Sequence, residues 1–466
     1  MPSTQSLFAR GQKRGASTPR PLRAVACCAA IGLALSFAGK ARGADQASAS
    51  TEVPVNVTIN QSNWEKYQQY MSEGMKAVWR GDHFFHFPAG TELKLAAPKS
   101  MPLPSFYSAA TKKYAGQAKL VPTSDGGYVT ENYQGGLPFP DPLSGDKDLT
   151  GQRIFWDLWY RYHPRVEAAA NCSYILDQYG NMTRTADTTL VYSQLSGVTD
   201  PGYQSTDSHA GPYYYVAFGL QTAPEAGKYL TTLNMLTQDP ADEPQLYEFV
   251  PTLRRSLRLS QSARCAPMFG TDLTFDDSFE GPPGLPQLFK IEYLGERKLI
   301  ALTHANPASF QKCGTATSVA EDYYYPGGKS IVPMLRTSSG DWEVRDVYAI
   351  SLKRLPQHSN GYCYGDRVIY VDKENYFPLA MDLYDASGNL YKWVAVFLTP
   401  SSMPGDPTAQ VLQISGNNTA FAVNFQDRHV TVFIGLKGCT DSECDGAGYG
   451  DATRWALPEG LAKIMQ

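Results

Sequence analysis

The stretch Arg367–Leu398, with the sequence RVIYVDKENYFPLAMDLYDASGNLYKWVAVFL, decides the fold class. Three runs of alternating residues are separated by the polar groups DKEN and DASGN. Short polar side chains, with Gly388 in the second group, favour reversal of the chain. The pattern therefore predicts a meander of three antiparallel strands, in which Asp372 and Asp385 are turn residues rather than catalytic acids.

The middle strand of this meander has the clearest apolar face. In an extended strand, Leu379, Met381 and Leu383 project to one side, while Asp382 projects to the other. We expect the three apolar side chains to face an interior surface. Asp382 is expected to point away from that surface.

The alternating pattern continues through most of the chain. Between Cys172 and Leu436, short runs are separated by turns, as in CSYILDQYGNMTRTADTTLVY, whose Tyr-Gly-Asn is typical of a hairpin tip. No helical segments alternate with these runs, as a parallel sheet would require. The chain is predicted to form one large curved antiparallel sheet.

Helices are expected mainly in the N-terminal third. SNWEKYQQYMSEGMKAVWRGD has capping-box spacing at Ser62 and Glu65 and predicts one amphipathic helix that ends before Gly81. A second, short helix is expected between Pro104 and Gly116. The strongest pattern begins at Thr150, in TGQRIFWDLWYRYH.

The first residues are typical of an export signal. Basic residues precede an apolar run from Ala24 to Phe37, which is shorter than the roughly 20 residues needed to cross a membrane. We predict a signal peptide over residues 1–43, cleaved near Gly43, and a single large domain over residues 44–466. Within this domain we expect a helix-rich part (44–165), the antiparallel sheet (166–436) and a disulfide-closed tail (437–466).

Charge and cysteine content narrow the function further. A net charge of -4 gives no basic surface for nucleic acid. Six cysteines follow the signal segment, and an even number in an exported protein predicts disulfides. CTDSEC makes Cys439 with Cys444 the best-supported pair, whereas the other four allow three pairings that spacing does not rank. Our preferred arrangement joins Cys313 to Cys363 and Cys172 to Cys265.

Carboxylates in FDDSFEG are the main candidates for catalysis. Asp276, Asp277 and Glu280 lie close together, and glycoside hydrolysis requires a pair of carboxylates. That reaction also needs the two groups to face each other in different environments, which neighbours on a turn do not ensure. We therefore interpret them as turn and capping residues. No Gly-x-Ser-x-Gly motif is present.

Metal binding is weakly indicated. His83 and His86 fall on opposite faces of a segment with strand character, so they are not expected to share a metal. TDSECDGAGYGD imitates a calcium loop, but Ala452 occupies the position of the bidentate glutamate. A disulfide-closed surface loop is the preferred interpretation. We predict no metal and no cofactor.

The run PTLRRSLRLS is the most informative basic segment. In a strand, Arg254 and Arg258 share one face while Arg255 lies on the other with Leu257. Arginine at the rim of an apolar surface can hold a phosphate or carboxylate head group by paired hydrogen bonds. The alternative is that these arginines pair with acidic residues of neighbouring strands.

Several motifs in their order along the chain resemble a known family. They are PAGTELKLAAP, KKYAGQAKLVP, GGLPFPDP, LRRSLRLS, FGTDLTFDDSFEG and the Arg367–Leu398 meander. Together they cover roughly Trp64 to Leu398 and are similar to domain of unknown function 1329, a family of exported bacterial proteins often described as outer-membrane lipoprotein-sorting-like. The chain lacks the N-terminal Gly-Asn-Asp-Gly-Thr-Ile-Pro type motif of the commoner subgroup.

The resemblance implies a relation to the periplasmic lipoprotein carrier and its outer-membrane receptor. It implies an α+β, mainly β fold, in which a strongly curved, half-open antiparallel sheet has its concave face covered by helices. The family's association with resistance-nodulation-division type exporters and outer-membrane proteins implies a periplasmic shuttle for lipid, lipoprotein or another hydrophobic cargo. No catalytic residues are implied.

For such a carrier we expect apolar side chains to line the cavity, with a helix carrying Trp156 and Trp159 as the lid. The head-group contacts are expected from Arg254, Arg255 and Arg258. The expected lining residues are Trp156, Trp159, Tyr213, Tyr215, Phe249, Leu253, Leu379, Met381, Leu383 and Trp393.

Two other functions fit parts of the sequence. One is a periplasmic glycan hydrolase that uses Asp276 or Asp277 with a second carboxylate. The other is an envelope scaffold whose tyrosine-rich face binds an exporter or an outer-membrane protein. Both differ from a carrier in requiring no bound lipid.

Overall fold

A computed structural model describes residues 53–277, 285–403, 406–411 and 419–465. The expected signal segment and Glu280 lie outside the described residues. Residues Glu52–Gln466 form one compact unit. In the described part of the chain, no helix has the length and hydropathy needed to cross a membrane.

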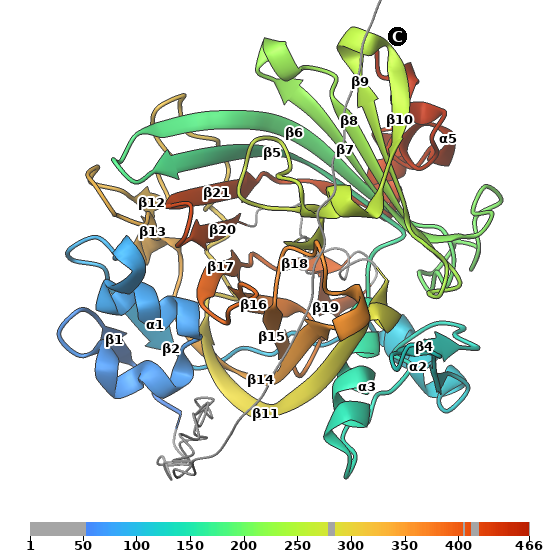
Figure 1. Cartoon of the computed structure of the whole chain (residues 1–466), viewed down its shortest axis with the longest axis horizontal. Helices are drawn as coiled ribbons and strands as arrows, with labels where there is room; N and C mark the ends of the chain where they lie inside the picture. The colour runs from blue at the N-terminus through green and yellow to red at the C-terminus, as the bar shows by residue number, and fades with distance from the viewer. Residues whose placement is uncertain (1–52, 278–284, 404–405, 412–418, 466) are drawn as a thin grey trace, which may run out of the picture. The chain divides into compact units, whose positions relative to one another are not determined.

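One large sheet dominates this unit (Figure 1). The upper arm in the figure contains the second half of the strand order, and the lower arm contains the first half. In spatial order the strands are β1 (Val57–Ile59), β2 (Leu93–Ala96), β14 (Trp342–Arg354), β15 (Asp366–Asp372), β16 (Pro378–Tyr384), β17 (Leu390–Phe397), β20 (Thr419–Asn424), β21 (His429–Gly435), β5 (Val166–Asp177), β6 (Met182–Gln194), β7 (Tyr213–Ala223), β8 (Thr231–Thr237), β9 (Gln245–Val250) and β10 (Arg255–Leu259).

Two further strands extend the sheet, because β11 (Phe289–Ala301) pairs with β14 and β22 (Cys439–Thr440) pairs with β5. Among the described strands of this sheet, β2 and β14 are parallel and every other pair is antiparallel. The two ends of the strand order do not pair with each other, so the sheet stays open. Small hairpins flank it: β3 (Lys119–Pro122) with β4 (Tyr128–Glu131), β12 (Tyr323–Tyr324) with β13 (Met334–Leu335), and β18 (Ser401–Met403) with β19 (Asp406–Val411).

The fold class expected from the sequence is confirmed. The Arg367–Leu398 meander forms β15, β16 and β17 in antiparallel register. Asp385 caps its turn by accepting hydrogen bonds from the N–H groups of Ser387 and Asn389, at 2.9 Å each. The hairpin expected after Cys172 is β5–β6, with Gly180 in the left-handed region at its tip.

The helices are α1 (Glu73–Arg80), α2 (Ser105–Tyr114), α3 (Lys147–Trp159), α4 (Asp441–Gly446), α5 (Ala452–Trp455) and α6 (Gly460–Lys463). The single first helix predicted over Ser62–Arg80 is wrong, because a 3-10 helix η1 (Trp64–Tyr70) precedes a separate α1. Ser72 interrupts the pattern by capping α1 through a hydrogen bond from the Met75 N–H, at 3.3 Å. Gly81 ends α1 in the left-handed conformation, as expected.

The two faces of the sheet are distinguished by the register of β16 and β17. Leu383 lies opposite Lys392, and Asp382 lies opposite Trp393. We name the face of Leu383 and Lys392 the inner face, and the face of Asp382 and Trp393 the outer face. Both faces of β16 are buried, because all seven of its residues are inaccessible to solvent. The strand is therefore flanked by packed layers on both sides.

Asp382 lies opposite the Leu379–Leu383 face, but it does not point towards solvent. Its carboxylate accepts hydrogen bonds of 2.9 Å from the N–H groups of Glu73 and Gly74, at the start of α1. A carboxylate satisfies the free donors of a helix N-terminus. A Cβ atom on Gly74 would lie 2.2 Å from the Trp393 side chain, so α1 packs directly on the outer face. Helices of the N-terminal third were expected on the concave face, whereas α1 packs on the outer face.

The C-terminal helices cover another part of the outer face. Trp455 of α5 packs edge-on against Phe218 of β7, with ring centroids 5.3 Å apart. Leu233 and Phe249 belong to the same apolar cluster. The tail α4–α6 thus closes the outer side of β5–β9.

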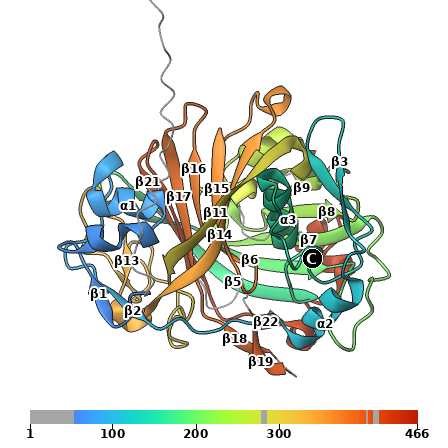
Figure 2. The same ribbon diagram turned by 90° about the horizontal axis from the view of Figure 1, so that it is seen from below.

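Two segments occupy the inner side. Helix α3 packs on β11 and β14 (Figure 2), where a Cβ atom on Gly151 would lie within 3.0 Å of the Tyr293 backbone. Tyr160, at the end of α3, packs against Tyr214 of β7, with ring centroids 5.3 Å apart. The second segment, Arg264–Asp277, is named the bridging segment because it contacts both arms of the sheet.

Candidate functional site

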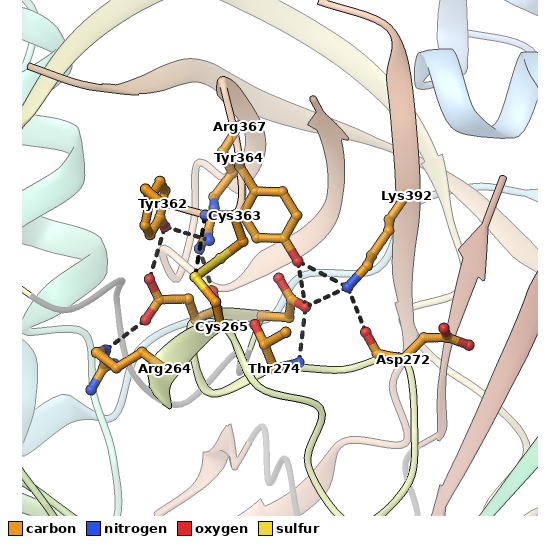
Figure 3. The surroundings of a disulfide bond; sticks show 11 residues. Arg264, Cys265, Asp272, Thr274, Tyr362, Cys363, Tyr364, Arg367 and Lys392 are labelled. Atoms are coloured by element: carbon orange, nitrogen blue, oxygen red, sulfur yellow. Dashed lines mark hydrogen bonds and ion pairs between the residues drawn. A yellow bond between two sulfur atoms is a disulfide. The ribbon is translucent and has the colours of Figure 1, made fainter. Parts of the chain in front are cut away.

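A disulfide holds the start of the bridging segment to the sheet (Figure 3). Cys265 is joined to Cys363, which precedes β15, and the structure also joins Cys172 to Cys313. The pairing expected between Cys313 and Cys363, and between Cys172 and Cys265, is wrong. Cys439 is joined to Cys444. The sheet brings β5 and the loop after β11 together, a proximity that sequence spacing does not reveal.

A buried ion pair joins the two ends of the bridging segment. The Arg264 guanidinium lies 2.6 Å from the Asp276 carboxylate and also donates to the Asn234 side chain of β8, at 3.2 Å. The Tyr362 hydroxyl donates to Asp276 at 2.8 Å. Arg367 of β15 donates to the Asp276 carbonyl. The Arg264–Asp276 pair therefore connects the segment to both arms of the sheet, Arg264 through Asn234 of β8 and Asp276 through Tyr362 and Arg367.

Asp277 makes a second set of contacts on the inner face, with Thr274, Tyr364 and Lys392, which are labelled in Figure 3. It accepts hydrogen bonds from the Tyr364 hydroxyl at 2.8 Å and from the Thr274 N–H at 2.9 Å. The Lys392 ammonium lies 3.4 Å from its carboxylate. Breaking one partner of a buried ion pair leaves an uncompensated charge, so these contacts act together to hold the segment in place.

Asp272 completes the attachment nearer the middle of the sheet. Its carboxylate accepts a hydrogen bond of 2.9 Å from the Asn424 side chain, and its carbonyl accepts one of 2.6 Å from Lys392. Burial raises the pKa of Asp272. Burial also raises the pKa values of Tyr362 and Tyr364 well above the usual value, so both phenols are neutral donors.

This arrangement does not favour hydrolysis by Asp276 and Asp277. The two residues are 1% and 0% exposed, and both carboxylates already bind basic and phenolic groups. A glycosidase needs two carboxylates on opposite sides of a substrate bond. In the conformation described, no substrate reaches them.

The metal interpretations find no support in the described residues, which contain no group of three or more His, Cys, Asp or Glu side chains arranged around a metal site. His83 lies in a short 3-10 helix with φ of 49° rather than in a strand. Asp441–Gly446 forms helix α4 instead of a calcium loop, and the disulfide closes it.

A small apolar cleft remains between the bridging segment and the inner face of β5–β8. Its volume is about 80 Å³. From the segment, Met268, Phe269 and Phe275 border the cleft while remaining half-buried. The sheet side of the cleft is lined by Ser173, Thr188, Leu190, Tyr192, Ala217, Gly219, Thr232, Asn234 and Phe433.

None of the ten expected lining residues borders this cleft. Trp156 and Trp159 are buried in α3, within the same core as Leu379, Met381 and Leu383. Tyr215 is also buried there, beside His163. The predicted lid helix is thus a packed element of the inner layer.

The remaining expected residues lie elsewhere. Trp393 is on the outer face beneath α1, and Phe249 and Tyr213 pack against the C-terminal tail. Leu253 is 58% exposed. The expected lining residues therefore do not share one surface, because they belong to two separate apolar clusters or are exposed.

The three arginines are exposed on the edge of the sheet. Arg254 ends a short 3-10 helix in the left-handed conformation, and Arg255 begins β10. The Arg258 guanidinium lies 4.0 Å from the Glu243 carboxylate, a surface pair. These residues do not line the apolar cleft.

Sequence reasoning missed the bridging-segment residues Met268, Phe269 and Phe275. The available signal was the unusual length of the loop that follows β10, since loops of that length are usually functional or held by crosslinks. Phe269 has φ of 49°, a left-handed conformation that the sequence does not indicate.

The fold and this site define a class: an open antiparallel sheet whose inner face is occupied by the chain's own segment over an apolar cleft. The sequence model described as "Protein of unknown function (DUF1329)" matches residues 58–442, so the chain belongs to this family. No curated protein matches the chain.

Parts of the chain are similar to solved structures. One is titled an outer membrane lipoprotein-sorting protein domain, from Vibrio parahaemolyticus, with 14% identity, a TM-score of 0.42, and coverage of 65% of this chain and 97% of that one. A DUF1329 family protein from Desulfovibrio piger has 11% identity, a TM-score of 0.40, and coverage of 66% and 95%. A LolA superfamily protein from Nitrosomonas europaea has 11% identity, a TM-score of 0.32, and coverage of 61% and 91%. These similarities do not identify a ligand for this chain.

Proposed function

We propose that the protein is an exported, non-enzymatic binding protein that carries a hydrophobic cell-envelope component, such as a lipid or the acyl chain of a lipoprotein. The observation that supports this proposal is the apolar cleft between the inner face of β5–β8 and the half-buried residues Met268, Phe269 and Phe275. Apolar surface that is neither packed nor fully exposed favours an apolar ligand.

The periplasm is the proposed location. Three disulfides suit an oxidising compartment. The family resemblance additionally suggests a resistance-nodulation-division type exporter and an outer-membrane protein as partners. These would supply or receive the cargo.

The size of the cleft sets a requirement on the mechanism. Its volume of about 80 Å³ accommodates only a few atoms, whereas sites for whole small ligands occupy roughly 300–1,000 Å³. Binding of an acyl chain therefore requires the bridging segment to move away from the sheet. Cys265 remains tied to Cys363, so the segment would pivot about that end.

The free energy gained by burying an acyl chain is comparable to the free energy lost when contacts of the bridging segment break. Burial of each CH₂ group contributes roughly 0.8 kcal/mol, so a chain of about 16 carbons contributes on the order of 10 kcal/mol before ordering costs. Each lost hydrogen bond to a charged group costs roughly 1.5–3 kcal/mol. Cargo can thus replace some of the contacts of Asp272, Asp276 and Asp277 without any catalytic group.

Native mass spectrometry of protein isolated gently from the periplasm tests the proposal, together with binding of an environment-sensitive fluorophore to delipidated protein. We expect bound lipid in the first measurement and saturable fluorescence in the second. Leu190→Asp places a carboxylate in the wall of the cleft and should weaken fluorophore binding at least about tenfold.

Thr189→Asp is the matched control, because it introduces the same charge one residue earlier on β6, on the opposite face. It should bind the fluorophore like the unmodified protein. Absence of lipid together with absence of fluorophore binding would refute the proposed function. Equal effects of the two variants would indicate that the fluorophore binds outside the cleft.

A further inference from the structure

A second, larger cleft lies at the end of α3, away from the apolar cleft's lining residues. Its volume is about 630 Å³. It is bounded by the end of β4 and the turn that follows, by Tyr160, and by the chain ends of β6, β7 and β8. The lining residues are Tyr114, Thr130, Glu131, Asn132, Tyr133, Gln134, Tyr160, Ser196, Gly197, Ser205, Thr206, Tyr214, Gln238, Asp239 and Pro240.

Tyrosines form the base of this cleft. The rings of Tyr133 and Tyr160 stack with centroids 3.6 Å apart, and Tyr214 meets Tyr160 edge-on at 5.3 Å. Burial raises the pKa of each of these phenols far above the usual value, so they stay protonated. Tyr160 and Tyr214 are almost fully buried and the Tyr133 hydroxyl is buried too, so these neutral phenols form a closed base beneath the polar rim.

The rim carries amides and hydroxyls. Asn132 and Gln134 are exposed on one side, and Ser205 and Thr206 are exposed on another. The charged groups among the lining residues are the carboxylates of Glu131 and Asp239, and no lysine or arginine lines the cleft. The electrostatic potential therefore opposes a phosphate or carboxylate ligand.

The walls are held in one shape. Asn132 has φ of 60°, and Gly136 has φ of 73°. A Cβ atom on Gly136 would lie 2.4 Å from the Thr111 backbone N, so this turn requires glycine. The hydroxyls of Thr130 and Tyr160 are 3.1 Å apart. The close packing of Gly136 on Thr111 and the contact between Thr130 and Tyr160 hold the turn that carries Asn132 and Gln134 at the rim.

The polar rim and the closed tyrosine base of this cleft favour some classes of ligand over others. An acyl chain would leave the amides and hydroxyls without partners, which costs free energy. A quaternary amine requires open ring faces around one point, whereas Tyr133 and Tyr160 cover each other's faces. A sugar offers many neutral hydroxyl groups that both donate and accept hydrogen bonds, which matches the amides and hydroxyls of the rim.

We propose that this cleft binds a short, uncharged oligosaccharide. Its volume lies within the roughly 300–1,000 Å³ typical of small-molecule sites, and it is large enough for more than one sugar ring. The proposal is independent of the cargo function, because the cleft and the apolar cleft share no lining residue.

Saturation-transfer NMR and calorimetry with maltotriose, cellotriose, chitotriose and isomaltotriose test the proposal on the full mature chain. We expect at least one of these sugars to bind with fast exchange and to receive saturation at its ring protons. Asn132→Gly keeps a backbone that tolerates the left-handed conformation and removes the amide, and Gln134→Ala removes an exposed amide. Each should weaken binding of that sugar about tenfold.

Gln69→Ala is the matched control, because it removes an exposed amide from η1, which does not line the cleft. It should leave the affinity unchanged. The proposal is overturned if none of the four sugars binds, if binding is unaffected by both cleft variants, or if Gln69→Ala weakens it equally. Binding of inorganic phosphate or phosphocholine at this cleft that none of the four sugars displaces would also overturn it.

Discussion

The inner and outer faces of the same sheet are closed in different ways. The outer face of β5–β9 carries Val191, Phe218 and Leu233, and the C-terminal tail covers it with Trp455 and Leu461. The inner face is closed by a segment held by buried ion pairs and one disulfide, above a small apolar cleft. The first closure is apolar packing, which is lost only on unfolding. The second depends on a few polar contacts that a ligand could replace.

The largest expected difference between the inner-face segment and the C-terminal tail is the loss of stability when the disulfide of each is removed. Cys265→Ser with Cys363→Ser removes a crosslink between residues 98 apart and should lower the free energy of unfolding by about 5 kcal/mol. Cys439→Ser with Cys444→Ser removes a crosslink between residues 5 apart and should lower the free energy of unfolding by about 2 kcal/mol. The loss is smaller because closing a short loop removes less conformational entropy from the unfolded chain. Guanidinium unfolding of both double variants measures the difference. Equal losses would show that loop closure does not explain the inner anchor.

Aromatic side chains provide the next comparison. Trp455→Ala in the outer tail should cost about 4 kcal/mol, because Trp455 is 8% exposed and packs on Phe218. Phe269→Ala in the bridging segment should cost about 1 kcal/mol or less, since its ring is half-buried. Thermal unfolding measured by circular dichroism checks both. If Phe269→Ala is the more destabilising variant, the bridging segment is a fixed part of the core.

The buried ion pair of the inner face should show strong coupling. Asp277→Leu leaves the Lys392 ammonium in a buried site and should lower the free energy of unfolding by about 3 kcal/mol. Asp277→Leu combined with Lys392→Leu should recover most of that loss, because no buried charge remains unpaired. A double-mutant cycle in urea measures the coupling. Additive effects would contradict the proposed role of the pair.

The smallest expected effect concerns pH on the outer face. Burial raises the pKa of Asp382 to about 6, although the α1 N–H groups oppose this rise. The folded protein therefore binds a proton there that the unfolded chain has already lost, so stability increases as pH falls through 6. Between pH 7.5 and pH 5 this contributes about 1 kcal/mol.

Asp382→Asn isolates this contribution, since every other titrating group stays in place. We expect the gain in unfolding free energy from pH 7.5 to pH 5 to be about 1 kcal/mol smaller in Asp382→Asn than in the unmodified protein. Urea unfolding at both pH values provides the measurement. An identical gain in the two proteins would mean that Asp382 titrates at its ordinary pH.

Local patterns predicted the strands well. The alternation in β15–β17 and the turn at Asp385 are dictated by neighbours in sequence, and both appear as expected. The break between η1 and α1 was not predicted, because the start of α1 is held by Asp382, far along the chain, as well as by the local cap Ser72.

The positions of the candidate sites could not be predicted from the sequence, because they depend on tertiary structure. Alternation places Leu379 and Asp382 on opposite sides of a strand but does not say that both sides are covered. Cysteine spacing identified Cys439 with Cys444, whereas the partners of Cys265 and Cys172 depend on which strands the sheet brings together. Family membership was recognisable because several short motifs keep their order along the chain.

By itself, the sequence determined the class of fold, the turns and the family, because these follow from periodicity and residue type over short distances. Only the tertiary structure decided which apolar face is packed, which segment fills the inner side, and where two clefts remain. Those outcomes depend on contacts between residues that lie far apart in the chain, such as Arg264 with Asn234, Asp277 with Lys392, and Tyr160 with Tyr133 and Tyr214. Such contacts leave no periodic pattern in the sequence.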